Sequence, residues 1–315
     1  MGTENGLNKR ILPPYAKWFS GKTALITGAT SGIGREIAKQ LALYGSRVLV
    51  CGRDKSAMDS LLKELNLISS DHPEGFTPLE NLTPRSSQDE HNYNLVLEKV
   101  VELKISPFLT GFISDLSDKN SQKELIEKIN KNYEVDILVN NAGFGYMNDF
   151  HLMPEDLINS MVEVNMAAVV DFCRAFLPKM IKKFQGGILN VGSVASFFAT
   201  PGSALYGATK HFVLGFTDAL HQEMLSFGVH ITGVYPGHTH SRFISRATSG
   251  KTKNWHKAMS PVLVAKLALK GLSENKIRVI PGLGNKMRVL AASIIPISMI
   301  LKKIYAKAVK NYKPR

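Results

Sequence analysis

The feature that most constrains the fold is a glycine-rich turn between a short apolar segment and an amphipathic one. Residues 23–27 read TALIT, which predicts a buried strand, and residues 33–43 carry apolar side chains at helical spacing. The turn between them reads GATSGIG. Its glycines let the backbone turn tightly and approach a pyrophosphate, and the helix that follows presents unpaired N–H groups. In this context the turn predicts a dinucleotide site rather than a glycine-rich turn without a ligand.

The rest of the chain repeats this alternation of apolar strands and helices. Continuous apolar strands separated by helices are typical of a parallel sheet covered on both faces. The pattern therefore predicts an α/β fold, a single doubly wound Rossmann-type domain with a mostly parallel seven-stranded sheet and helices on both faces. The expected strands are 23–27, 47–51, 111–114, 136–139, 187–191, 230–235 and 276–280, and the expected helices include 33–43, 54–65, 155–184 and 204–227.

One stretch breaks this alternation. Residues 68–94 are rich in Ser, Pro, Asp, Glu and Asn and show no apolar period, so they predict a flexible insertion between the second and third strands. Residues 95–103, LVLEKVVEL, return to helical spacing and predict a short helix. We expect an N-terminal extension at 1–20, the α/β domain at 21–284 with the insertion inside it, and a basic amphipathic tail at 285–315.

The positive charge is concentrated at the C-terminal end. The 315 residues include 39 Lys and Arg against 26 Asp and Glu, a net charge of +13, but no acidic residue follows Glu274. Without the ten basic residues that do follow it, 29 basic residues face 26 acidic ones. A basic tail on a nearly neutral body indicates contact with an acidic surface, such as anionic lipid, and disfavours a nucleic-acid partner. The ten residues are Lys276, Arg278, Lys286, Arg288, Lys302, Lys303, Lys307, Lys310, Lys313 and Arg315.

The tail also carries apolar residues from Met287 to Ile304, which allows two interpretations. It is either a helix docked on the body or on a sister subunit, or an interfacial anchor in peripheral contact with a membrane, which suits a lipid-like substrate. The longest uncharged apolar run, 289–301, is far shorter than the roughly 20 residues that a membrane span needs.

Other features bear on the compartment. The first ten residues, MGTENGLNKR, lack the apolar core of a signal peptide. Cys51 and Cys173 each lie in an apolar stretch and fit buried side chains in a reducing environment. We therefore expect a cytoplasmic protein, with peripheral membrane association if the tail is an anchor.

The end of the second strand bears on the choice of cofactor. An acidic side chain there usually holds the adenosine ribose of NAD, but this chain has Gly52 followed by Arg53. The Arg53 guanidinium can clamp a 2′-phosphate, with Arg35 as a helper, which predicts NADP(H). The alternative is a solvated arginine before the helix cap Asp54. Asp115, at the end of a later strand, can accept from the adenine amine, cap the next helix, or do both.

A tyrosine and a lysine share one face of a later helix. Tyr206 and Lys210 are four residues apart, and Ser193 stands at the end of the preceding strand. A tyrosine with a pKa of about 10 is a weak acid–base group at neutral pH, and a neighbouring ammonium stabilises its phenolate. Ser193 can hydrogen-bond a substrate oxygen. Such a pair is usually found on a surface, so its meaning depends on the motifs around it.

Together these motifs resemble the short-chain dehydrogenase/reductase family, in an NADP-preferring form. The resemblance extends over 22–284, apart from the insertion. The family's TGxxxGIG pattern is met at 27–34, its NNAG motif at 140–143 and its PG motif at 236–237. Its serine, tyrosine and lysine correspond to Ser193, Tyr206 and Lys210, and its helix asparagine to Asn165.

The resemblance implies a reaction and a role for each residue. Tyr206 exchanges a proton with the substrate oxygen, Lys210 lowers the pKa of that tyrosine and binds the nicotinamide ribose, Ser193 orients the carbonyl and Asn165 holds a relay water. The expected reaction reduces a ketone or aldehyde, or oxidises a secondary alcohol, with NADP(H), without a metal, in a homodimer or homotetramer. The residues expected at the cofactor are Gly28, Thr30, Ser31, Gly32, Ile33, Gly34, Arg53, Asp115, Asn141, Ala142, Gly143, Tyr206, Lys210, Pro236, Gly237, Thr239 and Ser241.

The segment after the PG motif departs from the family pattern. It reads HTHS, which leaves open whether Thr239 or Ser241 offers a hydroxyl to the cofactor. In the family this segment selects the substrate, and here Phe243 and Trp255 fit an apolar pocket or lid packing equally well. Two other functions compete: an NADP-linked alcohol or hydroxysteroid dehydrogenase working oxidatively, and a non-catalytic NADPH-binding sensor or scaffold. The complete set of catalytic side chains argues against the sensor.

Overall fold

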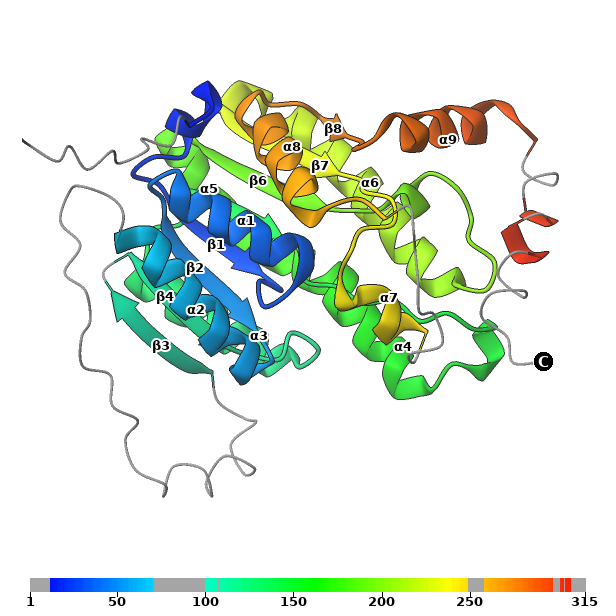
Figure 1. Cartoon of the computed structure of the whole chain (residues 1–315), viewed down its shortest axis with the longest axis horizontal. Helices are drawn as coiled ribbons and strands as arrows, with labels where there is room; N and C mark the ends of the chain where they lie inside the picture. The colour runs from blue at the N-terminus through cyan, green and yellow to red at the C-terminus, as the bar shows by residue number, and fades with distance from the viewer. Residues whose placement is uncertain are drawn as a thin grey trace, which may run out of the picture.

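A mainly parallel sheet forms the centre of the protein (Figure 1). The computed structural model describes residues 12–70, 100–106, 108–248, 258–296, 301–302 and 304–306. In these ranges eight strands follow the order β3-β4-β2-β1-β5-β6-β7-β8, and only β3 and β4 pair antiparallel. The strands are β1 (Thr23–Thr27), β2 (Arg47–Gly52), β3 (Val101–Ser106), β4 (Leu109–Ile113), β5 (Ile137–Asn140), β6 (Gly186–Val191), β7 (Val229–Val234) and β8 (Arg278–Val279).

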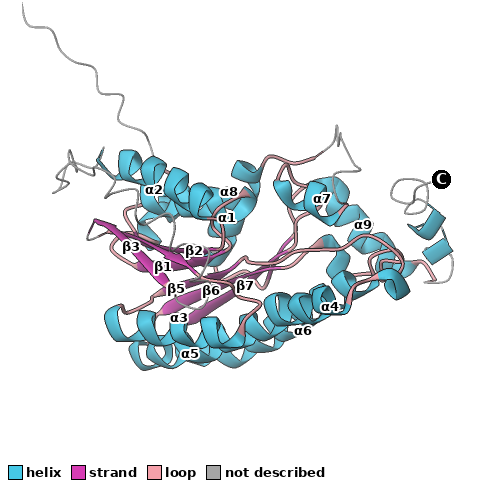
Figure 2. Cartoon of the chain, turned by 90° about the horizontal axis from the view of Figure 1, so that it is seen from below, coloured by secondary structure: helices cyan, strands magenta, loops and turns pink. Residues whose placement is uncertain are grey.

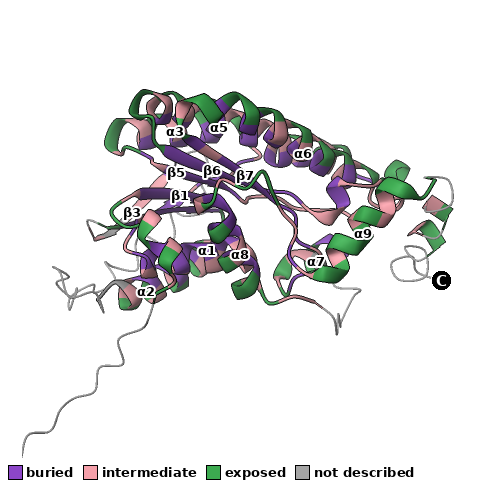
Figure 3. Ribbon diagram, turned by 90° about the horizontal axis from the view of Figure 1, so that it is seen from above, coloured by how far each residue is buried: buried purple, intermediate pink, exposed green. Residues whose placement is uncertain are grey.

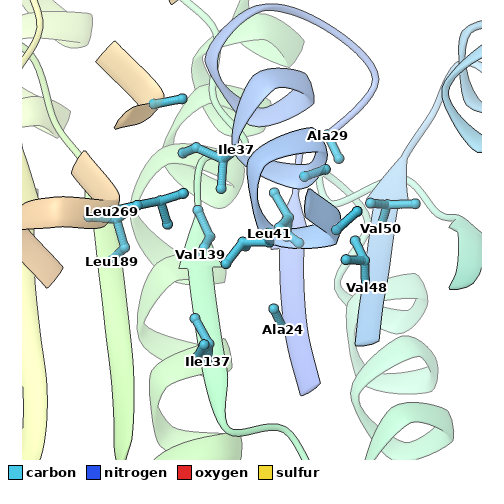
Figure 4. Packing of buried hydrophobic residues seen from close by; sticks show 14 of the residues in the cluster. Ala24, Ala29, Ile37, Leu41, Val48, Val50, Ile137, Val139, Leu189 and Leu269 are labelled. Carbon is cyan, nitrogen blue, oxygen red and sulfur yellow. The ribbon is translucent and has the colours of Figure 1, made fainter. Parts of the chain in front are cut away.

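Helices cover both faces of the sheet, as Figure 2 shows. Side chains of β1 alternate between the faces: Ala24 and Ile26 belong to one buried apolar cluster and Leu25 to the other. Figure 4 shows Ile37 and Leu41 of α1 among the first cluster, over Ala24 and its neighbours. The predicted doubly wound α/β fold is therefore confirmed. One face carries α1 (Gly32–Leu43), α2 (Lys55–Ser70) and α8 (Pro261–Ser273), and the other carries α3 (Lys119–Asn132), α5 (Ala168–Lys183) and α6 (Ala204–Met224).

The predicted count of seven strands is wrong, because an eighth strand begins within the last three residues of the helix expected at 95–103. Residues 101–103 lie in β3, which pairs antiparallel with β4, whereas 95–99 lie outside the described residues. The sequence VELKI alternates apolar and polar residues, and the polar Glu102 accepts a hydrogen bond from Tyr133 Oη at 2.9 Å. Pairing with the edge of β4 satisfies this two-residue period, which a helix would not.

The long helix expected at 155–184 contains a wider turn. α4 (Glu155–Val162) passes through a π-helical turn, Glu163–Ala167, into α5. Such turns carry one extra residue and often occur at functional sites. Asn165 lies inside this one.

The segments outside the sheet also have defined places. Ala16 and Phe19, within the expected N-terminal extension, are buried against the core. The first three residues of the expected insertion, 68–70, continue α2, and 71–94 lie outside the described residues. Two further helices are α7 (Arg242–Ala247) and α9 (Leu283–Ile294). In the described part of the chain, no helix combines the length and apolar character that crossing a membrane requires.

Candidate active site

The glycine-rich turn leaves space only for backbone. Gly28 has a φ of 64°, and a Cβ at this position would lie 2.7 Å from the Cα of Ala142. A Cβ at Gly34 would lie 2.2 Å from Nδ2 of Asn141. Both distances are too short for a side chain, so the turn can be approached closely by a ligand but not occupied by one of its own side chains.

A set of hydrogen bonds joins this turn to the end of β5. The backbone N–H groups of Asn141 and Ala142 both donate to Thr27 Oγ1 at 3.1 Å. Asn141 Nδ2 donates to the carbonyl oxygens of Thr27 and Gly28 at 3.0 and 2.9 Å. The two neighbouring strand ends are thereby fixed as one unit. Sequence reasoning did not single out the Thr27 hydroxyl, although its place at the start of the glycine-rich pattern was a signal.

A cavity of about 500 Å³ opens beside the turn, at the N-terminus of α1. Arg35 lines it and donates to Glu64 Oε1 at 2.7 Å and to Ser60 Oγ at 3.0 Å. Arg242 lines it from the other side and pairs with Asp54 at 3.5 Å. Sequence reasoning named Arg35 as a helper but did not assign a role to Arg242. The lining residues are Thr30, Ser31, Gly32, Arg35, Ala57, Ser60, His240, Ser241 and Arg242.

Arg53 lies at the end of β2, beside Asp115 at the end of β4. Its guanidinium is 3.4 Å from Asp115 Oδ2, and its side chain is 60% exposed. Asp115 does not cap α3 as one prediction allowed: Asp118 does, by accepting from the N–H groups of Asn120 and Ser121. Burial opposes ionisation of Asp115, but hydrogen bonds from Ser117 and the charge of Arg53 hold its pKa below the ordinary value. An ionised carboxylate therefore stands next to the guanidinium.

Ser193, Tyr206 and Lys210 meet at the carboxyl edge of the sheet. Ser193 follows β6 and hydrogen-bonds the Tyr206 side chain. Lys210 Nζ donates to the Val191 carbonyl at 2.9 Å and lies 5.9 Å from the Tyr206 ring centroid. Phe243 of α7 covers the tyrosine, with the two ring centroids 5.4 Å apart. The structure thus brings Ser193, which follows a strand, to the helix face that Tyr206 and Lys210 share.

Burial dominates the acid–base properties of this group. It raises the pKa of Tyr206 to about 12, although the hydrogen bond with Ser193 acts in the opposite direction. It also lowers the pKa of Lys210 to about 8. Burial therefore dominates the pKa of each group in this arrangement, and the lowering of the tyrosine pKa by the ammonium stays a prediction. At neutral pH the phenol is protonated.

Asn165 lies fully buried in the π-helical turn and holds the loop after β5. Its Nδ2 donates to the Phe144 carbonyl at 2.9 Å and to Thr209 Oγ1 at 3.1 Å. Its Oδ1 accepts from the Phe144 N–H at 3.1 Å and lies 3.1 Å from where a Cβ of Gly143 would be. This arrangement fixes the loop next to Lys210; the relay water predicted from the family resemblance remains a prediction.

The segment after the PG motif returns to the glycine-rich turn. The Pro236 carbonyl accepts from Val194 N–H at 3.0 Å, so the motif lies beside the loop that carries Ser193. The Thr239 hydroxyl donates to the Gly237 carbonyl, whereas the Ser241 side chain lies 2.9 Å from where a Cβ of Gly32 would be. Of the two candidate hydroxyls, only that of Ser241 lines the cavity. Trp255 lies outside the described residues.

A doubly wound sheet with this turn and this group of side chains defines a class of dinucleotide-fold oxidoreductases. Within that class, residues 22–76 and 86–252 of this chain match the sequence profile of the short chain dehydrogenase family. The chain therefore belongs to the short-chain dehydrogenase/reductase family.

Individual relatives are distant. The chain is 26% identical over 307 residues to dehydrogenase/reductase SDR family member 7B of Xenopus laevis, a match that covers 95% of this chain and 85% of that protein. It is 25% identical to the bulky-bulky ketone specific alcohol dehydrogenase of Comamonas testosteroni, with a TM-score of 0.64 and coverage of 87% and 95%. A short-chain dehydrogenase of Sphingobium yanoikuyae in complex with NADPH shares the fold, with 24% identity, a TM-score of 0.67 and coverage of 87% and 96%.

Proposed function

We propose that this protein is an NADP(H)-dependent oxidoreductase that reduces a ketone or aldehyde, or oxidises the corresponding secondary alcohol. The observation that carries the proposal is the meeting of Tyr206, Ser193 and Lys210 next to the loop after β5, where Lys210 Nζ lies 3.4 Å from where a Cβ of Gly143 would be. A phenol, a hydroxyl and an ammonium in one place can bind and protonate a carbonyl oxygen.

The cavity beside the turn fits a dinucleotide phosphate. The turn excludes side chains at Gly28 and Gly34, and the N-terminus of α1 presents backbone N–H groups to the cavity. Arg35 and Arg242 line the cavity and Arg53 stands nearby, which supports a 2′-phosphate and hence NADP(H) over NAD(H). When bound, the nicotinamide supplies or accepts the hydride.

The chain's own residues manage the proton at the substrate oxygen. Tyr206, whose pKa burial raises to about 12, is protonated at neutral pH and donates to the carbonyl oxygen when the substrate is reduced. Ser193 holds the same oxygen through its hydroxyl. Lys210 places a positive charge beside the phenol, which favours the phenolate left after proton transfer. Asn165 acts as a positioning residue by fixing the loop at Phe144.

The wall over Tyr206 is apolar, which supports an apolar or lipid-like carbonyl substrate. Phe243 packs on the tyrosine ring, and its Cζ lies 2.9 Å from where a Cβ of Gly145 would be. The backbone N–H of Met147 donates to the Ala247 carbonyl at 3.0 Å, so α7 is held against the loop after β5. Peripheral contact of the basic tail with a membrane would suit such a substrate. We also propose a homodimer or homotetramer, which light scattering tests.

The catalytic assignment is tested by Tyr206→Phe. We expect turnover with a panel of ketones to fall a hundredfold or more, because general acid–base groups contribute roughly 10²–10⁴, while NADPH still binds. Tyr15→Phe, on a tyrosine that packs against Tyr44 away from this site, is the control and should keep wild-type turnover. Wild-type turnover by the Tyr206 variant would show that the assignment is wrong.

The cofactor preference is tested by titrating NADPH and NADH. NADPH should bind at least tenfold more tightly, since a clamped phosphate contributes more than about 1.4 kcal/mol. Arg53→Ala and Arg242→Ala should each weaken NADPH binding and leave NADH binding nearly unchanged. Equal affinities of the wild-type protein for the two cofactors would contradict the preference.

A further inference from the structure

One helix of the protein exposes its apolar side. Leu283, Met287, Leu290 and Ile294 of α9 are 77%, 56%, 52% and 72% exposed. Their spacing of four, three and four residues places them in one line along the helix. We call these four residues the α9 row. Figure 3 shows α9 at the edge of the molecule, drawn mostly in green for exposed residues.

The side of α9 that meets the body is anchored by a polar residue. Asn285 lies 2.5 Å from where a Cβ of Gly237 would be, and its Nδ2 donates to the Pro281 carbonyl at 2.7 Å. No residue of α9 is buried. A surface helix normally turns its apolar side inward. The α9 row has the reverse orientation, which in soluble domains marks an interaction surface.

The charge around the row identifies the partner. Lys286 is exposed and lies about 70° around the helix from the row, whereas Arg288, also exposed, lies about 130° from it, on the side of Asn285. Lys302 is also exposed, and no acidic residue follows Glu274 in the whole sequence. A second copy docked row to row would bring like charges together. An anionic lipid surface instead offers acyl chains to the row and headgroups to the bases.

We propose that the α9 row, with Lys286 beside it, docks the protein on an anionic lipid surface, with α9 lying in the plane of the interface. Twelve residues make a helix about 18 Å long, which suits lying along a surface. Lys286 and the absence of acidic residues after Glu274 account for a preference for anionic over neutral lipid.

Docking through α9 would set the active site close to the lipid. Asn285 meets Gly237 of the PG motif, and Tyr305 donates to Asp149 Oδ1 at 3.2 Å, in the loop after β5. Next to Asp149, Phe150 and Leu152 are 55% and 54% exposed. The C-terminal segment therefore touches two of the loops that frame the site. If the protein has the proposed oxidoreductase function, this placement favours a substrate that enters the site from the lipid.

The test measures sedimentation of the full-length protein with vesicles, without substrate. Wild-type protein should bind phosphatidylcholine vesicles that contain phosphatidylserine, bind pure phosphatidylcholine vesicles less, and be released by salt. Leu290→Glu should weaken binding to the anionic vesicles at least tenfold. Leu225→Glu, at a leucine 45% exposed far along the chain from α9, is the matched control and should bind as wild type. Lys286→Gln with Arg288→Gln should reduce the difference between the two vesicle types.

Two further measurements keep the outcomes distinct. NADPH binding by each variant checks that it is folded, and light scattering gives its oligomeric mass. Failure of the wild-type protein to bind anionic vesicles at low salt would overturn the proposal. Binding of Leu290→Glu to anionic vesicles as tightly as the wild-type protein would also overturn it. If the oligomeric mass of Leu290→Glu then falls below that of the wild-type protein, the row is a contact between copies of the chain. Because no turnover is measured, failure here is separate from failure of the proposed oxidoreductase activity.

Discussion

Replacing Lys210 with methionine should make the protein more stable at neutral pH while it removes activity. Lys210 is 5% exposed, and burial lowers its pKa from 10.5 to about 8. That fall corresponds to about 3 kcal/mol against the charged form. Methionine fills similar space without a charge, but it loses the hydrogen bond to the Val191 carbonyl, which costs about 1 kcal/mol. The net gain at pH 7 should be about 2 kcal/mol.

The pH dependence gives this prediction a second readout. Between about pH 8 and 10.5 the folded protein carries fewer protons on Lys210 than the unfolded chain does. The free energy of unfolding of the wild-type protein therefore rises with pH in this window, and the penalty is complete below it. Lys210→Met lacks this rise, so its advantage should nearly vanish by about pH 10.

Urea unfolding of both proteins at pH 7 and pH 10, without cofactor, measures the effect. Lys123→Met, at a side chain that is 78% exposed, is the matched control and should stay within about 0.5 kcal/mol of wild type at both pH values. A Lys210 variant that is less stable than wild type at pH 7, or a difference that does not change with pH, would refute the reasoning.

Three further perturbations test other parts of the structure. Gly34→Ala puts a methyl group 2.2 Å from Asn141 Nδ2, so calorimetry should show NADPH binding weakened at least tenfold. The control is Gly215→Ala, in open space on α6, which should leave NADPH binding unchanged and raise the free energy of unfolding by about 0.5–1 kcal/mol. Equal NADPH affinities of the two variants would contradict this. Phe243→Ala should leave the Kd for NADPH unchanged and raise kcat/KM for bulky ketones relative to small ones. Replacing residues 71–94 with a short Gly/Ser bridge should preserve the circular dichroism spectrum and turnover, and loss of folding would show that the segment is structural.

The parts of the site that lie within one strand–turn–helix unit could be predicted from the sequence. The positive φ of Gly28 depends on local backbone geometry, and the spacing of Tyr206 and Lys210 depends only on helical periodicity. The end of β6, where Ser193 lies, follows from the apolar strand before it. These are short-range rules, and the structure places the residues where those rules indicate.

The features that were missed depend on contacts between distant segments. β3 reads as a helix until its pairing with β4 is known, because both periods fit so short an apolar run. The ion pair between Arg242 and Asp54 joins residues 188 positions apart. The pKa of Tyr206 rises because distant segments remove the phenol from water, and such burial is a property of the whole fold.

The π-helical turn at Glu163–Ala167 lets one continuous helix serve two different partners. An extra residue rotates everything beyond it by about 100° relative to an unbroken helix. α4 packs on α6, with Met161 buried, whereas α5 packs on the sheet at β5 and β6. An unbroken α-helix could not turn the apolar side of α4 toward α6 and the apolar side of α5 toward the sheet at the same time. Deleting one residue from this turn should therefore lower the free energy of unfolding more than substituting any side chain in it, because the change in helical phase would be lost and the apolar side of one of the two halves would face solvent.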